Sequence, residues 1–199
     1  IRFLAQYRGL RSLARAKQLA EYFELDTGAK LKKMSKGTKQ KVAIVCAFMH
    51  DPQLYVLDEP TSGLDPLMQS RFVELLQEEQ KKGKTILLSS HMFEEVEKTC
   101  TRTAIIRAGH IAAVKDMQAL SHSKRKYFTV RFETPAMAAQ FAAEFAGAGA
   151  QGAYVTLPVA ASQADAVIKR LAAYKVEDLS VRAQTLEELF MHFYGGEEK

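Results

Sequence analysis

Two adjacent carboxylates, Asp58 and Glu59, stand at the end of a short apolar run, residues 53–57. Such a run predicts a buried strand, and open α/β sheets bind their ligands at the carboxyl ends of their strands. One carboxylate at that edge can hold Mg²⁺ through its water shell, while the next faces a water that attacks a phosphate. The plain alternative is that Asp58, Glu59 and Pro60 only end a strand and open a turn.

A histidine, His91, follows the next β-type run, residues 85–89. A lone histidine is usually structural, but neighbouring parallel strands end at the same edge of a sheet. His91 would then lie beside the carboxylate pair and could take part in its chemistry.

A small, glycine-containing turn, residues 34–37, precedes a helix predicted from about residue 38 to residue 50. Ser35 and Gly37 open this helix, and the backbone N–H groups and dipole of a helix start can receive a phosphate. Lys36 has two interpretations that the sequence does not separate. Its ammonium group could face that phosphate, or it could project into solvent.

The elements that must position these residues alternate between strand and helix over residues 1–123, which indicates a largely parallel α/β layer. An amphipathic segment at residues 1–25 predicts helix, broken at Gly9. Asp65 is a predicted N-cap, with Pro66 at the first helical position. The other predicted elements are a helix to residue 82, strand 85–89, helix 92–99, and strands 103–108 and 110–115.

The character of the chain changes after residue 123. Residues 124–199 predict a separate small α+β unit, similar in element order to a ferredoxin-like sandwich. Its last helix has Thr185 as a cap, with Glu188 three residues on. The predicted elements are strands 127–132, 154–159 and 176–181, and helices 135–148, 162–174 and 186–194.

Composition excludes several classes of protein. The 199 residues are 47% hydrophobic, with 28 Lys and Arg against 23 Asp and Glu, which is typical of a globular chain with a mild positive charge. Cys46 and Cys100 have neither CxxC spacing nor a histidine cluster, so no zinc site or disulfide framework is predicted. No apolar run approaches the roughly 18 to 20 residues that cross a bilayer, so we expect any membrane connection to go through a partner.

Three segments together resemble the motifs of ABC ATPases. Residues 54–66, LYVLDEPTSGLDP, match the Walker B motif and D-loop of that family. Residues 34–42, MSKGTKQKV, resemble its LSGGQ signature, with Met for Leu, Lys for the first Gly and Thr for Gln. Residues 89–91, SSH, resemble its switch histidine. The chain is therefore similar to the C-terminal part of an ABC ATPase: a partial P-loop core with a helical subdomain, followed by a small α+β domain.

The resemblance implies a role for each matching position. Asp58 would bind Mg²⁺ through water, Glu59 would polarise the attacking water, and His91 would contact the γ-phosphate of ATP and Glu59. Ser62 and Asp65 would lie along the interface of a homodimer. The ATP held by the opposite subunit would meet Ser35, Lys36, Gly37 and Thr38. Ser-Lys-Gly variants of the signature also occur among exporter-type subunits.

The phosphate-binding loop of the family, GxxxxGK[ST], is absent from the sequence. Gly83, Lys84 and Thr85 imitate its end, but Glu78 stands where the first glycine belongs, and the tripeptide leaves a helix to enter a strand. Because Ile1 also begins inside a predicted helix, we expect a truncated cassette. Alone, the chain is expected neither to bind ATP tightly nor to hydrolyse it, and to expose an edge or an apolar face that favours self-association.

The leading hypothesis is an energy-coupling ATPase subunit of an exporter-type transporter. It would be cytoplasmic, peripheral on the inner face of the membrane, bound to transmembrane permease subunits and without a nucleic-acid partner. One alternative is a soluble ABC ATPase acting on ribosomes or nucleic acid, with the basic runs as phosphate contacts. Another is a non-catalytic dimerisation or regulatory module made from the C-terminal unit.

Overall fold

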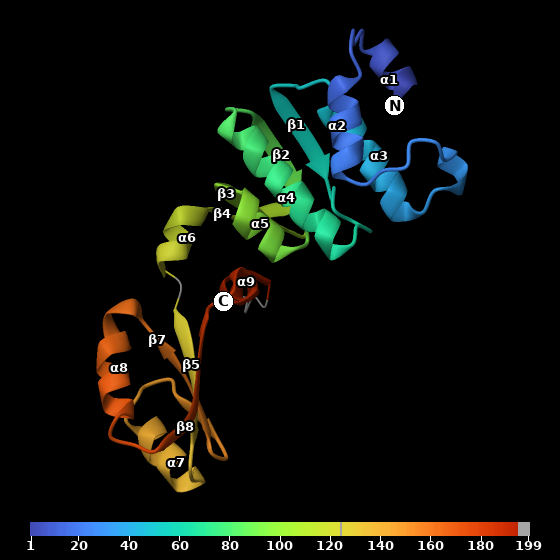
Figure 1. The fold of residues 1–199 in the computed structure, drawn as a ribbon. Helices are drawn as coiled ribbons and strands as arrows, with labels where there is room; N and C mark the ends of the chain where they lie inside the picture. Colours follow the sequence, from blue (N-terminus) through green and yellow to red (C-terminus); the bar gives the residue numbers. More distant parts are fainter. Residues whose placement is uncertain (124, 195–199) are drawn as a thin grey trace. The chain divides into compact units, whose positions relative to one another are not determined.

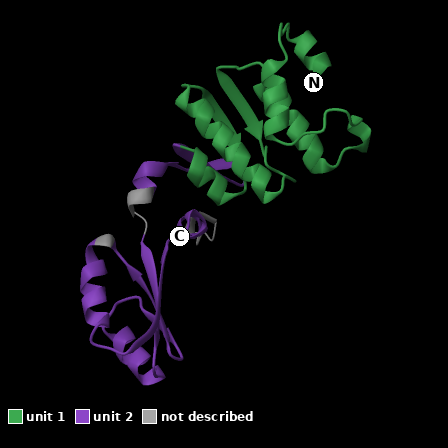
Figure 2. Ribbon diagram, in the orientation of Figure 1, with its two compact units in different colours: residues 1–100 green, residues 101–199 purple. Residues whose placement is uncertain are grey.

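The computed structural model describes residues 1–123 and 125–194, which form two compact units, Ile1–Cys100 and Thr101–Lys199 (Figure 2). A hairpin of strands β3 (Arg102–Arg107) and β4 (His110–Asp116) lies in the second unit by this division. The predicted domain boundary between residues 123 and 124 stays a prediction. Within the described ranges, no helix combines the length and apolar character needed to cross a bilayer.

The first unit contains helices around one pair of strands (Figure 1). Its elements are α1 (Arg2–Tyr7), α2 (Ala14–Tyr22), the 3-10 turn η1 (Leu31–Lys33), α3 (Lys36–Phe48), β1 (Leu54–Asp58), α4 (Pro66–Lys81), β2 (Thr85–Ser89) and α5 (Phe93–Thr99). Strands β1 and β2 are parallel, with Asp58 opposite Ser89. This register places the ends of both strands at the same edge of the sheet.

The core of this unit lies where α2, α3 and α4 meet one face of the strand pair. Phe48 of α3 stacks on Tyr55 of β1, with ring centroids 4.3 Å apart, and meets Phe72 of α4 edge to face. All three side chains are buried, so they fix the two helices against β1.

The opposite face of the strand pair is open. Leu54, Val56 and Leu87 are 55%, 69% and 65% exposed. The prediction of a buried strand is therefore correct for the face that carries Tyr55 and wrong for the other face, because side chains alternate across a strand and no layer of the first unit covers this side. Of the exposed edge or apolar face that the sequence predicts, the apolar face is present.

The second unit contains a four-stranded antiparallel sheet in the order β6-β7-β5-β8. Its elements beyond the hairpin are α6 (Met117–Ser123), β5 (Lys126–Phe132), α7 (Pro135–Ala143), β6 (Gly149–Gln151), β7 (Tyr154–Val159), the 3-10 turn η2 (Ala161–Gln163), α8 (Ala164–Leu171), β8 (Val176–Ala183) and α9 (Leu186–Tyr194). This β-α-β-β-α-β order with two central strands is the ferredoxin-like arrangement that the sequence predicts.

Buried side chains from one face of this sheet and from its two helices form a second core, which includes Phe128, Phe132, Phe141 and Leu171. The predicted fold class, an α/β core followed by a small α+β unit, is confirmed.

Candidate active site

The edge where β1 and β2 end carries the two predicted carboxylates. Asp58 is the last residue of β1, and one of its carboxylate oxygens accepts a hydrogen bond from the Ser89 hydroxyl. The backbone N–H of Glu59 donates to the Ser89 carbonyl oxygen at 3.2 Å and to its hydroxyl oxygen at 3.0 Å. Ser89, at the end of β2, therefore holds both acidic residues in place.

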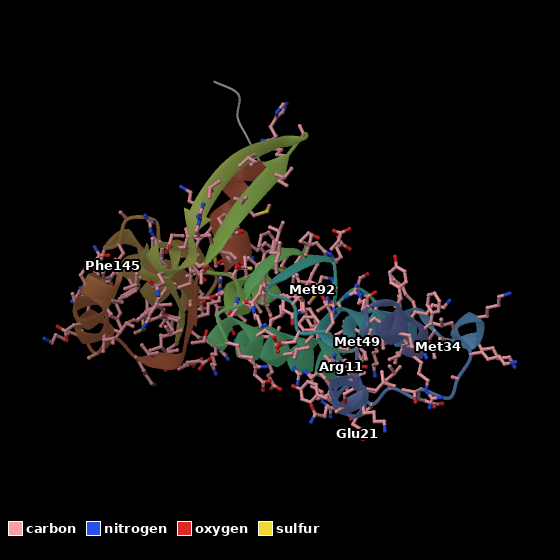
Figure 3. The ribbon with its side chains drawn as sticks, turned by 90° about the horizontal axis from the view of Figure 1, so that it is seen from above. Arg11, Glu21, Met34, Met49, Met92 and Phe145 are labelled. Carbon is pink, nitrogen blue, oxygen red and sulfur yellow. The ribbon has the colours of Figure 1, made fainter. Side chains whose placement is uncertain are left out.

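His91 joins this edge from the loop between β2 and α5. Its Nδ1 lies 3.3 Å from Oε1 of Glu59, with 68% of the histidine side chain and 51% of the glutamate side chain exposed. The predicted proximity of His91 to the carboxylates is thus present in the geometry, and both groups stay accessible to a ligand. Figure 3 labels Met92, the next residue along the chain.

Glu59 has a positive φ of 40°. Only a few per cent of non-glycine residues adopt this left-handed region, and such strain is concentrated at functional sites. The turn that follows, residues 59–65, is called the acidic turn below. The N–H of Ser62 donates to the Glu59 carbonyl oxygen at 3.1 Å, and that of Leu64 to the Thr61 carbonyl oxygen at 3.0 Å.

The acidic turn ends in a helix cap. Asp65 is the N-cap of α4, and its side chain accepts a hydrogen bond from the N–H of Met68 at 3.0 Å, with Pro66 at the start of the helix. The prediction of this cap is confirmed. The cap fixes the far end of the acidic turn, as Ser89 fixes its beginning.

The second predicted group, the signature-like turn (residues 34–37), opens α3. Ser35 is the N-cap, and its hydroxyl accepts from the N–H of Thr38 at 3.1 Å and lies 2.9 Å from the Thr38 hydroxyl. The helix therefore begins at Lys36, two residues before its predicted start. Lys36 donates from Nζ to the Ser62 hydroxyl at 3.0 Å, which connects this group to the acidic turn.

Sequence reasoning missed several residues that build the site. Ser89 carries a detectable signal, because it ends the strand run that precedes His91. Thr61 and Glu95 are both buried, and the Thr61 hydroxyl lies 3.4 Å from Oε2 of Glu95, a contact that joins the acidic turn to α5. Gln40 donates to the Pro60 carbonyl oxygen at 2.7 Å. Neither Glu95 nor Gln40 has a sequence signal of its own.

The chemistry of the edge suits a hydrated magnesium ion. Mg²⁺ prefers oxygen ligands and is often held by one or two carboxylates together with phosphate oxygens. Asp58 and Glu59 are adjacent, exposed oxygen donors, and the described residues contain no group of three or more His, Cys, Asp or Glu that could enclose a metal. The protein oxygens here therefore fit a metal that arrives with a phosphate ligand.

An ionic cluster around the buried Glu79 contacts β1 through Tyr55. Glu79 of α4 is only 1% exposed and meets the Tyr55 hydroxyl at 3.1 Å, Arg15 at 3.1 Å and Lys82 at 2.7 Å. Burial, followed by the charge of Glu79, raises the pKa of Tyr55 well above its usual value, so this hydroxyl stays a donor. The cluster ties α2 to the strand that carries Asp58.

A separate hollow lies elsewhere on the first unit. It has a volume of about 970 Å³ and is lined by α2, the loop after it and the start of α3, including Leu13, Glu21, Leu25, Met34 and Val42. Figure 3 labels Glu21 and Met34 in this region. The hollow contains none of the predicted catalytic residues, so it is a separate surface from the sheet edge.

Comparison with known proteins finds relatives that match part of the chain. The chain is 42% identical over 91 residues to ABC transporter ATP-binding protein NatA of Bacillus subtilis, a match that covers 46% of this chain and 37% of that protein. The relatives of this chain are ABC transporter ATP-binding proteins. Nod factor export ATP-binding protein I of Rhizobium meliloti is 40% identical over 94 residues, covering 46% of this chain and 28% of its own. The resemblance to ABC ATPases is confirmed.

A solved structure described as an ATP-binding subunit of an ABC transporter matches with 37% identity and a TM-score of 0.53, covering 60% of this chain and 52% of its own. The family model "AAA domain, putative AbiEii toxin, Type IV TA system" matches residues 13–95, under half of the chain. The residues matched by this model contain the signature-like turn, the acidic turn and His91. The chain spans about a third of the length of the relatives named above.

Proposed function

We propose that this chain supplies the water-activating half of an ABC-type ATPase that drives transport across a membrane. The observation that carries the proposal is the 3.3 Å approach of Glu59 and His91 beside Asp58, at the common edge of two parallel strands. Glu59 orients and deprotonates the attacking water, and His91 fixes the Glu59 carboxylate and contacts the γ-phosphate. Asp58 holds Mg²⁺, which when bound neutralises charge on the phosphate oxygens.

We further propose that the site is completed by other protein segments. The sequence has no phosphate-binding loop, and the exposed Leu54, Val56 and Leu87 form a face on which further strands of the cassette can pack. Ser35, Gly37 and Thr38 meet the nucleotide of a second copy, and Ser62 and Asp65 lie along that interface. Without these additions the chain is inactive.

The proposed membrane partner is a pair of permease subunits on the cytoplasmic side. The hollow lined by Leu13, Leu25 and Val42 offers an apolar surface on the helical segment around residue 34, where we expect the permease to bind. The names of the relatives support transport, and the second relative is named for Nod factor export.

The test of this proposal begins with the gene. A reading frame that continues upstream of Ile1 into a strand and a GxxxxGK[ST] loop, within about 120 residues, would supply the longer protein for an ATPase assay. In that protein we expect Glu59→Gln to lower kcat by about 10²- to 10⁴-fold while MgATP binding is kept. Glu94→Gln, an exposed glutamate on α5, is the matched control. Full activity of the Glu59→Gln protein would overturn the proposal.

A further inference from the structure

The start of α3 lies directly against the acidic turn of the same chain. A Cβ placed on Gly37 would meet the Gly63 carbonyl oxygen at 2.5 Å, closer than real Cβ atoms come to a neighbour. Only glycine allows the helix backbone to pass this close. The two turns are therefore in backbone contact.

Two side chains of α3 strengthen this contact. Lys36 and Gln40 are four residues apart, so they lie on one face of the helix. Gln40 donates to the Pro60 carbonyl oxygen, and Lys36 donates to the Ser62 hydroxyl. The Cγ and Cδ atoms of Lys36 come within 3.2 Å of the position where Gly63 would carry a Cβ, so the stem of this side chain covers Gly63.

The sequence predicts that Lys36 faces either a phosphate or solvent, and neither interpretation includes its hydrogen bond to Ser62. Its side chain is exposed, yet it lies along the acidic turn instead of projecting away from it. In the part of the chain that the structure describes, no carboxylate forms an ion pair with Lys36. Lys36 instead donates to the Ser62 hydroxyl, and the N–H of Ser62 donates in turn to the Glu59 carbonyl oxygen.

We propose that Lys36 is a positioning residue, which holds the acidic turn against α3 so that Ser62 and the backbone of Glu59 keep one arrangement. The lysine that replaces the first signature glycine thus joins the signature-like turn to the acidic turn within one chain. Its relevance to hydrolysis rests on the proposed function, but the contact itself does not, because it involves no nucleotide.

Amide hydrogen exchange on this chain, followed residue by residue by NMR, tests the proposal. The N–H groups of Ser62 and Leu64 are hydrogen-bonded inside the acidic turn, so their exchange reports its opening. Because one exposed hydrogen bond changes such an equilibrium by about two- to tenfold, Lys36→Met should speed exchange of both amides by that factor. Lys36→Arg keeps a donor on a long stem and should restore protection.

Two further variants make the result decisive. Ser62→Ala removes the acceptor, so it should speed Leu64 exchange as much as Lys36→Met does, and combining the two changes should add nothing. Lys39→Met is the matched control on the same helix and should leave both amides unchanged. Unchanged exchange in Lys36→Met would overturn the proposal. Equal acceleration at Met49, whose N–H bonds to the Val45 carbonyl oxygen near the other end of α3, would also overturn it, because that pattern marks a general loss of stability.

Discussion

Glu59 and His91 come together because β1 and β2 are parallel and in register. Asp58 pairs with Ser89, so the residues that follow each strand leave the sheet at the same edge, and Nδ1 of His91 lies 3.3 Å from Oε1 of Glu59. A slip of one residue between the strands would turn the side chains of β2 to the other face of the sheet relative to those of β1, and would change how His91 meets Glu59. The pair therefore depends on the strand register more than on any contact of its own.

The first prediction concerns His91. Because its side chain is largely exposed, His91→Ala should change the free energy of unfolding by less than about 0.5 kcal/mol. In a longer protein with a phosphate-binding loop, the same change should lower kcat by about 10²-fold. His110→Ala, an exposed histidine on β4, is the control for both measurements. If the His91→Ala protein kept wild-type turnover, His91 would have no role in hydrolysis.

The second prediction concerns nucleotide affinity. The carboxylates of Asp58 and Glu59 repel a phosphate unless a metal ion lies between them and it. The sequence has no GxxxxGK[ST] loop to bind the phosphates of ATP. Isothermal titration of the purified chain with MgATP should therefore give a Kd weaker than about 1 mM, equivalent to a binding free energy of about −4.1 kcal/mol. Micromolar binding would show that these residues form a complete nucleotide site.

The third prediction concerns Gly37. Glycine to alanine inside a helix normally stabilises it by about 1 kcal/mol. At this position the new methyl group meets the Gly63 carbonyl oxygen at 2.5 Å, so Gly37→Ala should instead destabilise the first unit by about 1 to 3 kcal/mol. Urea unfolding followed by circular dichroism measures this. Gly149→Ala in β6 of the second unit, with nothing within 4 Å of the added atom, should leave the unfolding of the first unit unchanged. A stabilised Gly37→Ala protein would contradict the close contact.

The fourth prediction concerns Glu79. Truncation to alanine leaves the buried Tyr55 hydroxyl without its acceptor and removes the partner of Arg15 and Lys82. We expect a loss of about 2 to 3 kcal/mol in the free energy of unfolding of the first unit. Glu78→Ala, the neighbouring position on α4, is the control. Equal stability of the two variants would mean that the cluster contributes nothing net.

The fifth prediction concerns pH. Hydrogen bonds from Arg170 and Tyr174 lower the pKa of Glu144 from 4.5 to about 2, and the Arg170 Nη2 to Glu144 Oε1 distance is 2.6 Å. Because the pKa is lowered by folding, the contact stabilises the second unit above pH 4.5, and this contribution is lost as the pH falls towards 2.

Glu144→Gln should therefore lower the Tm of the second unit at pH 6, and the difference from wild type should disappear near pH 2. Thermal unfolding followed by circular dichroism across that range measures it. Glu187→Gln, a glutamate in the first turn of α9, serves as the control. A difference that stays constant with pH would show that the Glu144 charge is not responsible.

Much of the fold could be predicted from local patterns. Strand 85–89, strand 154–159 and helix 186–194 have the predicted bounds. The helix at 186–194 also has the predicted reciprocal cap, in which the Thr185 hydroxyl and the Glu188 carboxylate each accept from the other residue's N–H. These elements have strong periodicity or cap chemistry, so tertiary context had little to change.

The misses have physical causes. Helix α7 ends at Ala143 instead of residue 148, because the chain turns before β6 begins at Gly149, with Gly147 at a positive φ of 80° that a helix does not allow. The helix predicted over residues 162–174 is shorter: residues 161–163 form the 3-10 turn η2, and α8 runs from Ala164 to Leu171 with Gln163 as its N-cap. Helix α6 was not predicted. Contacts such as Lys36 to Ser62 depend on the meeting of two distant turns, which no local pattern encodes.

Because Glu59 has a positive φ, stability and function favour different residues at this position of the acidic turn. Glycine or asparagine would relax this backbone, so a procedure that selected sequences for thermal stability alone would replace Glu59 early. The melting temperature would rise while the carboxylate beside His91 was lost. Any stabilised version of this chain should therefore be screened for function at this position before it is adopted.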